Sequence, residues 1–193
     1  MQTAVAFDAE GPVSVLLVYD DQGTVTVSRI DVDESGRVVK PEAVVLAGNK
    51  AVHMRALAVD ARKDHPIAFL AVGNDRREYN RLALVRLPLA GPLDARDFRS
   101  LPGWPSRTEN GRTVLLSPTE MSLEVSPDGV PWVAIIDERG HLTGGALNGS
   151  PLTLLRRDGG PCSNPFIAAL PGKVTPGCFT ETGQLFPSGA HDH

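Results

Sequence analysis

Four carboxylates lie at or near the ends of short apolar segments: Asp8, Asp60, Glu124 and Asp128. Carboxylate oxygens are the ligands that calcium prefers, and carboxyl groups also serve as catalytic acids and bases. If the ends of these segments lie together, the four side chains could bind a divalent cation such as calcium. An Asp in a turn also accepts hydrogen bonds from the backbone and fixes the turn, and this role alone explains their placement. We therefore favour the structural role. If a metal ion does bind, Asp8, Asp60 and Asp128 are the candidate ligands.

The chain has only two cysteines, Cys162 and Cys178, which bracket a segment with two prolines and two glycines. We expect a disulfide between them, because a bridge that closes a loop of this length adds about 3 kcal/mol in the chain-entropy model. The alternative is two free, buried thiols that pack as small apolar groups. A disulfide would indicate an extracytoplasmic protein, periplasmic or secreted, although the N-terminus lacks the features of a signal peptide. Free thiols would fit the cytoplasm.

No catalytic signature is recognisable in the sequence. It contains no G-x-S-x-G elbow, no P-loop and no G-x-G-x-x-G segment, and its five histidines share no spacing typical of metal sites. We therefore name no catalytic residue and expect no cofactor.

Composition limits the classes of protein. The 19 glycines and 16 prolines are together 35 of 193 residues, about 18%, which favours many short elements joined by turns. A net charge of −4 without a long basic cluster argues against nucleic-acid binding. No segment reaches the roughly 18 apolar residues of a membrane span.

Three segments of the chain share one pattern: residues 4–31, 57–87 and 123–149. Each has an apolar strand, a short turn to a proline, a very apolar second strand, a polar turn and a third strand. Candidate fourth strands are residues 43–48, 112–117 and 151–157. The second strands, VSVLLVY, IAFLAVG and WVAIID, are continuous apolar runs, which predicts strands covered on both faces.

Units of about 40–50 residues with four short strands are typical of β-propeller blades. The turn Ser126-Pro-Asp-Gly129 resembles the turn of TolB- and YVTN-type blades. It also resembles the Asp-box of sialidase-like propellers, although it is one residue shorter. The resemblance covers residues 4–157 and implies an all-β propeller or partial propeller of about three to four four-stranded antiparallel blades. The alternative is a β-sandwich.

In this interpretation residues 1–193 form one domain, with units at about 4–48, 54–117 and 121–157 and an irregular C-terminal unit at 158–193. The fourth unit matches poorly, and three units do not readily close a ring. We therefore favour a partial ring, whose open faces and strand edges would attract a partner.

The sequence thus predicts a non-catalytic protein-interaction or assembly module that binds another polypeptide or the rest of a longer chain. The segment 91–112, treated as an insert, is a second expected contact, with Trp104 as an aromatic anchor unless its ring packs onto the unit below. The alternative function is a hydrolase- or lactonase-like propeller enzyme with carboxylates and a cation at the central channel.

Overall fold

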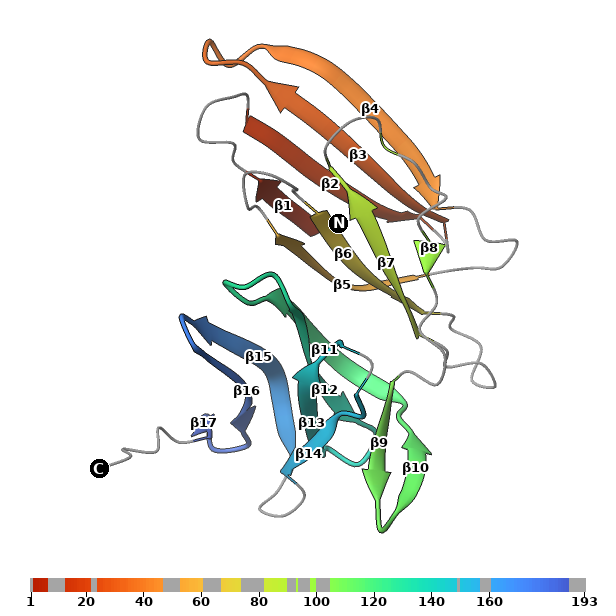
Figure 1. Cartoon of the computed structure of the whole chain (residues 1–193), viewed down its shortest axis with the longest axis vertical. Coiled ribbons are helices and arrows are strands. Elements are labelled where there is room, and N and C mark those ends of the chain that lie inside the picture. The colour runs from red at the N-terminus through yellow and green to blue at the C-terminus, as the bar shows by residue number, and fades with distance from the viewer. Residues whose placement is uncertain are drawn as a thin grey trace. The chain divides into compact units, whose positions relative to one another are not determined.

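The computed structural model of the chain describes residues 2–6, 13–21, 24–46, 53–60, 67–73, 82–89, 93, 98–99, 105–148, 150–156 and 161–187. These residues form an all-β protein of several small antiparallel sheets (Figure 1). None of them belongs to a helix long and apolar enough to cross a bilayer. The contacts divide the chain into two compact units, Met1–Leu101 and Pro102–His193.

The first unit contains two four-stranded sheets, each a meander in which consecutive strands are neighbours. The first sheet consists of β1 (Gln2–Ala6), β2 (Val13–Asp21), β3 (Thr24–Val32) and β4 (Val38–Leu46). The second sheet consists of β5 (His53–Asp60), β6 (Ile67–Gly73), β7 (Leu82–Pro88) and β8 (Phe98–Arg99).

The two sheets of this unit pack face to face through aliphatic side chains. Alternate residues of β2 and β3 point to the second sheet, as the period of two in a strand requires. The core contains Leu16, Val18, Val25, Val27, Ala68, Leu70, Val85, Leu87 and Leu89. At its end the buried Arg29 donates hydrogen bonds to the Leu89 carbonyl at 2.5 Å and to Glu42 at 2.9 Å. This contact ties the first sheet to the end of β7.

The second unit begins with a hairpin and continues with two further meanders. The hairpin is β9 (Ser106–Glu109) and β10 (Arg112–Leu115). The third sheet consists of β11 (Pro118–Val125), β12 (Pro131–Asp137), β13 (Leu142–Ala146) and β14 (Thr153–Arg156). The fourth sheet consists of β15 (Cys162–Leu170), β16 (Lys173–Thr180) and β17 (Leu185–Phe186). The core between the last two sheets contains Ala134, Ile136, Leu142, Cys162 and Cys178.

One predicted strand was wrong. Residues 112–117 were expected to be the fourth strand of the second sheet, but β10 pairs with β9, and β8 takes that place beside β7. The reason lies in Asn110 and Gly111, whose φ angles of 48° and 75° form a two-residue hairpin loop. Such a loop returns the chain to its immediate neighbour. Strand β8 therefore lies inside the segment 91–112 that the sequence suggested was an insert.

Four turns share one hydrogen-bonding pattern: residues 33–36, 126–129, 137–140 and 180–183. In each, the N–H of the last residue, a glycine with φ between 74° and 82°, donates to the carbonyl of the first residue. The side-chain oxygen of the first residue (Asp33, Ser126, Asp137 or Thr180) accepts from the backbone N–H four positions later, at 2.9–3.1 Å. The Ser-Pro-Asp-Gly turn is therefore one copy of a recurring turn that needs glycine at its last position.

In the first of these turns the pKa of Asp33 lies below its usual value of 3.8. The main cause is the hydrogen bond from the Ser35 hydroxyl, followed by that from the Arg37 backbone N–H. Because folding favours the charged carboxylate, this contribution to stability is complete above pH 3.8 and is lost as the pH falls through the lower, folded-state pKa. We expect an NMR titration of the Asp33 carboxyl to have its midpoint below 3.8, and Ser35→Ala to raise it. A wild-type midpoint at or above 3.8 would contradict this arrangement.

Candidate functional site

The most concentrated group of charged side chains surrounds Arg107 on β9, which is only 2% exposed. Its Nη1 donates to Asp137 Oδ2 at 3.0 Å and to Thr143 Oγ1 at 2.8 Å. Its Nε donates to Glu109 Oε1 at 2.8 Å, and Nη2 lies 2.6 Å from the same oxygen. A single guanidinium thus links the hairpin to β12 and β13 of the third sheet.

Asp137 has a second role, because it is also the first residue of one of the four turns. Its Oδ1 accepts from the backbone N–H groups of Arg139 at 2.9 Å and His141 at 3.0 Å. Its Oδ2 receives Arg107, and His141 Nδ1 lies 3.6 Å from it. Both oxygens of this carboxylate are therefore already engaged within the protein.

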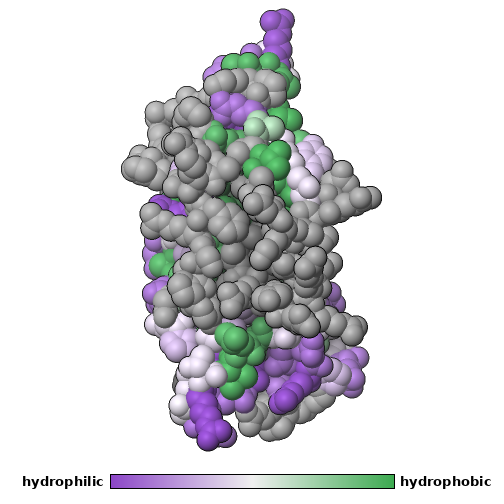
Figure 2. All heavy atoms as spheres, turned by 90° about the vertical axis from the view of Figure 1, so that its right-hand side faces the viewer, coloured by the Kyte–Doolittle hydropathy of each residue, from purple (hydrophilic) through white to green (hydrophobic). Residues whose placement is uncertain are grey.

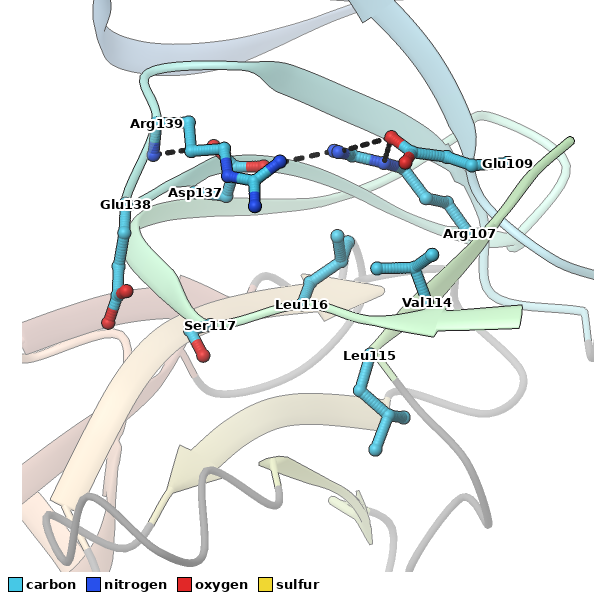
Figure 3. A pocket seen from close by; sticks show the side chains of 9 residues that line it. All are labelled: Arg107, Glu109, Val114, Leu115, Leu116, Ser117, Asp137, Glu138 and Arg139. Atoms are coloured by element: carbon cyan, nitrogen blue, oxygen red, sulfur yellow. Dashed lines mark hydrogen bonds and ion pairs between the residues drawn. The ribbon is translucent and has the colours of Figure 1, made fainter. Parts of the chain in front are cut away.

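A cavity of about 200 Å³ adjoins this ion cluster (Figure 3). It is lined by Arg107, Glu109, Val114, Leu115, Leu116, Ser117, Asp137, Glu138 and Arg139. Figure 3 shows Val114 and Leu116 pointing toward the cluster, whereas Leu115 points to the other side of the strand. The cavity is smaller than the roughly 300–1,000 Å³ of typical small-molecule pockets. Through the bonds of Arg107 to Asp137 and Thr143, this cluster attaches the hairpin to the third sheet.

The carboxylates singled out from the sequence are not gathered at one place by the described contacts. Asp60 ends β5 and is 4% exposed. Asp128 is exposed in its turn and accepts a hydrogen bond from Ser126 Oγ, and Glu124 Oε1 accepts one from the Val125 N–H at 3.4 Å. Asp8 and Trp104 lie outside the described residues. Within the residues that the structure describes, no group of three or more His, Cys, Asp or Glu side chains could hold a metal ion.

The disulfide predicted from the sequence is confirmed. Cys162 and Cys178 are bonded, and both are buried in the core between the third and fourth sheets. The bridge joins β15 to β16, on the face that also carries Ile167 and Phe186. A disulfide is typical of proteins in an oxidising environment.

The first sheet has an outer face, opposite its core, that carries no charged residue among the side chains described. Its members follow from the strand register: Val15, Leu17, Tyr19, Thr24, Thr26, Ser28, Ile30, Ala43 and Val45. All nine are half-buried or exposed, with Tyr19 at 39% and Val45 at 47%. In a sheet with one face in solvent, apolar residues on the buried face normally alternate along each strand with polar residues on the exposed face. The outer face of the first sheet departs from this rule, because it carries apolar side chains as well.

The second strands of the first three meander sheets make the contrast clear. In β6, Ile67–Ala71 are all buried, and in β12, Val133–Asp137 are all buried, so both faces of these strands are covered as their apolar runs predict. Among the described side chains of β2, Leu16 and Val18 are buried, whereas Leu17 and Tyr19 on the other face are not. The first sheet therefore has the sequence of a sheet covered on both sides and is covered on one.

The fourth sheet has a similar outer face, opposite the disulfide. It carries Ser163, Phe166, Ala168, Leu170, Lys173, Thr175, Phe179 and Leu185. Leu170 is 62% and Leu185 is 52% exposed. The rings of Phe166 and Phe179 meet edge to face with centroids 5.9 Å apart, and Phe166 lies over Gly177, where a side chain would overlap the ring. The register thus gathers aromatic and aliphatic groups on a face with a single charge.

Neither Asp137 nor Arg107 was singled out from the sequence, although Asp137 ends an apolar run and starts an Asp-x-x-Gly turn, a signal that could have found it. Arg107 is 30 residues away in the chain, and no local pattern points to that contact. On the side of the molecule shown in Figure 2, apolar side chains of described residues reach the surface at several places. No protein-family model and no curated protein matches the chain.

Proposed function

We propose that the chain is a non-catalytic assembly module, and that it binds another polypeptide through the outer faces of its first and fourth sheets. The observation that carries this proposal is the outer face of the first sheet, whose described side chains include no charged group and which keeps Tyr19 and Val45 in solvent. Contiguous exposed apolar surface of this kind marks interaction sites in soluble proteins. The fourth sheet offers a second such surface through Phe179 and Leu185.

We further propose that the sheets are blades of the propeller type. Each is a meander, and the first strands of successive sheets are in contact, β1 with β5 and β11 with β15, as the innermost strands of adjacent blades are. An open series of such blades has one uncovered face at each end. The disulfide supports an extracytoplasmic location for the assembly.

The carboxylates support this function better than an enzymatic one. Asp33 and Asp137 accept backbone hydrogen bonds that hold their turns, and Asp128 accepts the Ser126 hydroxyl. Each of these oxygens is used in fixing the fold, which is the structural role that turn chemistry predicts.

Site-specific photocrosslinking in the cells that produce the protein tests the proposal. A benzophenone side chain at Val45 or at Phe179 should yield a covalent adduct with a polypeptide, because both positions lie on the proposed surfaces. The same group at the exposed Glu181, in the turn next to Phe179, is the matched control and should yield none. The proposal fails if neither face gives an adduct, or if Glu181 gives adducts in equal yield.

A further inference from the structure

We propose that the polypeptide covering these faces is a second copy of this chain, with the first sheet of one copy packed on the fourth sheet of the other. This inference rests on the proposed function and names its partner. It follows from the way the strand edges are protected, from the chemistry of the two faces and from their size.

The strand edges indicate packing by faces rather than by strand addition. The outermost strands β8 and β17 have two residues each, and the edge strand β4 contains Lys40 and Pro41. Short edge strands, lysine and proline are the usual means of preventing a further strand from pairing. The backbone edges are therefore blunted, whereas the side-chain faces beside them stay apolar.

The chain already packs its own sheets in the way proposed. The core of the first unit joins two sheets face to face through aliphatic side chains, and the core of the second unit does the same. The surface that best covers an outer sheet face is thus another sheet of the same kind. A second copy supplies such sheets, and each copy leaves two faces uncovered.

The two outer faces differ in relief in a way that favours pairing one with the other. On the first sheet, the small residues Ser28 and Ala43 are paired across β3 and β4, next to the pair of Thr26 and the larger Val45. On the fourth sheet, the Phe166–Phe179 pair supplies bulky rings. Rings packed over small residues fill space that two like faces would leave empty, and empty space at an interface loses dispersion contacts.

The faces are large enough for a specific interface. Strands β2, β3 and β4 have nine residues each. At about 3.3 Å per residue and about 4.8 Å between strands, these three strands cover about 30 Å by 14 Å, and with the five-residue β1 the first sheet covers about 510 Å² in projection. Side-chain relief raises the accessible area toward the roughly 800 Å² per partner of a standard interface.

The pairing is heterologous, because each interface takes the first sheet from one copy and the fourth sheet from the other. Heterologous contacts form a closed ring where the rotation between copies closes, and an open series where it does not. In either case every interface of the assembly contains one face of each kind.

Light scattering of the purified chain over a range of concentrations, combined with face-specific substitutions, tests this inference. We expect the mass of the wild-type protein to rise with concentration from 20.6 kDa to at least 41.2 kDa, the mass of two copies. Val45→Glu on the first sheet and Phe179→Glu on the fourth each bury a charge at every interface, so each should weaken association at least about tenfold. Glu181→Lys, a charge change in the neighbouring turn, should have no such effect. Since Val45 and Phe179 are exposed, neither substitution disturbs a core.

Mixing the two weakened variants distinguishes this pairing from others. The Val45→Glu copy keeps its fourth sheet and the Phe179→Glu copy keeps its first sheet, so an equimolar mixture has one intact interface. We expect pairs in the mixture at concentrations where each variant alone is monomeric. Pairing of like faces would instead leave one variant dimeric alone, and either that result or no recovery in the mixture overturns the inference.

A wild-type chain that stays at 20.6 kDa at all concentrations also overturns it. In that case photocrosslinks from Val45 and Phe179 to a polypeptide of another mass would leave the proposed function standing. If no crosslinks form either, both the proposed function and the pairing of copies are wrong.

Discussion

Replacing Arg107 with methionine should lower the free energy of unfolding of the second unit by about 3–5 kcal/mol, the cost of breaking a buried ion pair. Methionine keeps the length of the side chain but leaves Asp137, whose side chain is 10% exposed, without its cation. It also removes the donor to Thr143, which is fully buried. Urea denaturation followed by tryptophan fluorescence and circular dichroism measures the change.

Arg139→Met is the matched control, because Arg139 is exposed and should change stability by no more than about 0.5 kcal/mol. A second variant separates charge from packing. Asn at position 137 keeps Oδ1 for the turn and removes the charge, so Arg107→Met with Asp137→Asn should regain part of the loss. An Arg107→Met protein within 1 kcal/mol of wild type would show that the cluster does not hold the hairpin; about 3 kcal/mol is the lower limit expected for such a pair.

Removing the disulfide should cost the second unit about 3 kcal/mol, the chain-entropy value for a loop of this length. The bridged cysteines are 16 residues apart. Their replacement in the double variant Cys162→Ala, Cys178→Ala also leaves small gaps beside Ala134 and Ile136, so the variant should be at least as unstable as the reduced protein. Denaturation with and without reductant gives the measurement.

The chain provides its own controls for this prediction. Both cysteines belong to the second unit, so the unfolding of the first unit should not respond to reductant. The double alanine variant should not respond to it either. Two titratable thiols in the denatured, unreduced chain would contradict the bridge, as would equal stability in the two conditions.

Most strands could be predicted because their signals are local. Apolar runs of strand length lie between turn residues. Strands β2 and β6 begin at Val13 and Ile67, where the pattern predicts a second strand, and β12 begins at Pro131, one residue before the predicted start. The disulfide was also predictable, since two cysteines allow a single pairing. Both inferences need only the order of residues along the chain.

Contacts between distant residues could not be predicted in this way. Strand β8 has two residues, which are too few to show the alternation of a strand. The clearer strand pattern, at residues 112–117, belongs to the local hairpin of β9 and β10 and not to the second sheet. The pairing of Arg107 with Asp137 depends on how the hairpin lies on the third sheet. The placement of carboxylates at strand ends suggested a shared site, but the described turns use these groups singly.

The apolar sequence of β2 is informative because it disagrees with the burial of β2 in the isolated chain. Its composition matches that of β6 and β12, which are buried on both sides, yet Leu17 and Tyr19 face outward. A consistent explanation is that a partner supplies the second cover. We therefore expect the outer faces to be open in the single chain and covered in the assembly.

Hydroxyl-radical labelling with mass spectrometry tests that claim most directly. In dilute, monomeric protein, Tyr19 and Phe179 should be oxidised at rates typical of exposed aromatic rings, while the buried Phe69, 6% exposed, is protected. On assembly, the rates at Tyr19 and Phe179 should fall severalfold and the rate at Phe69 should not change. If Tyr19 and Phe179 are as protected as Phe69 at every dilution, the chain covers these faces itself, and the account is contradicted.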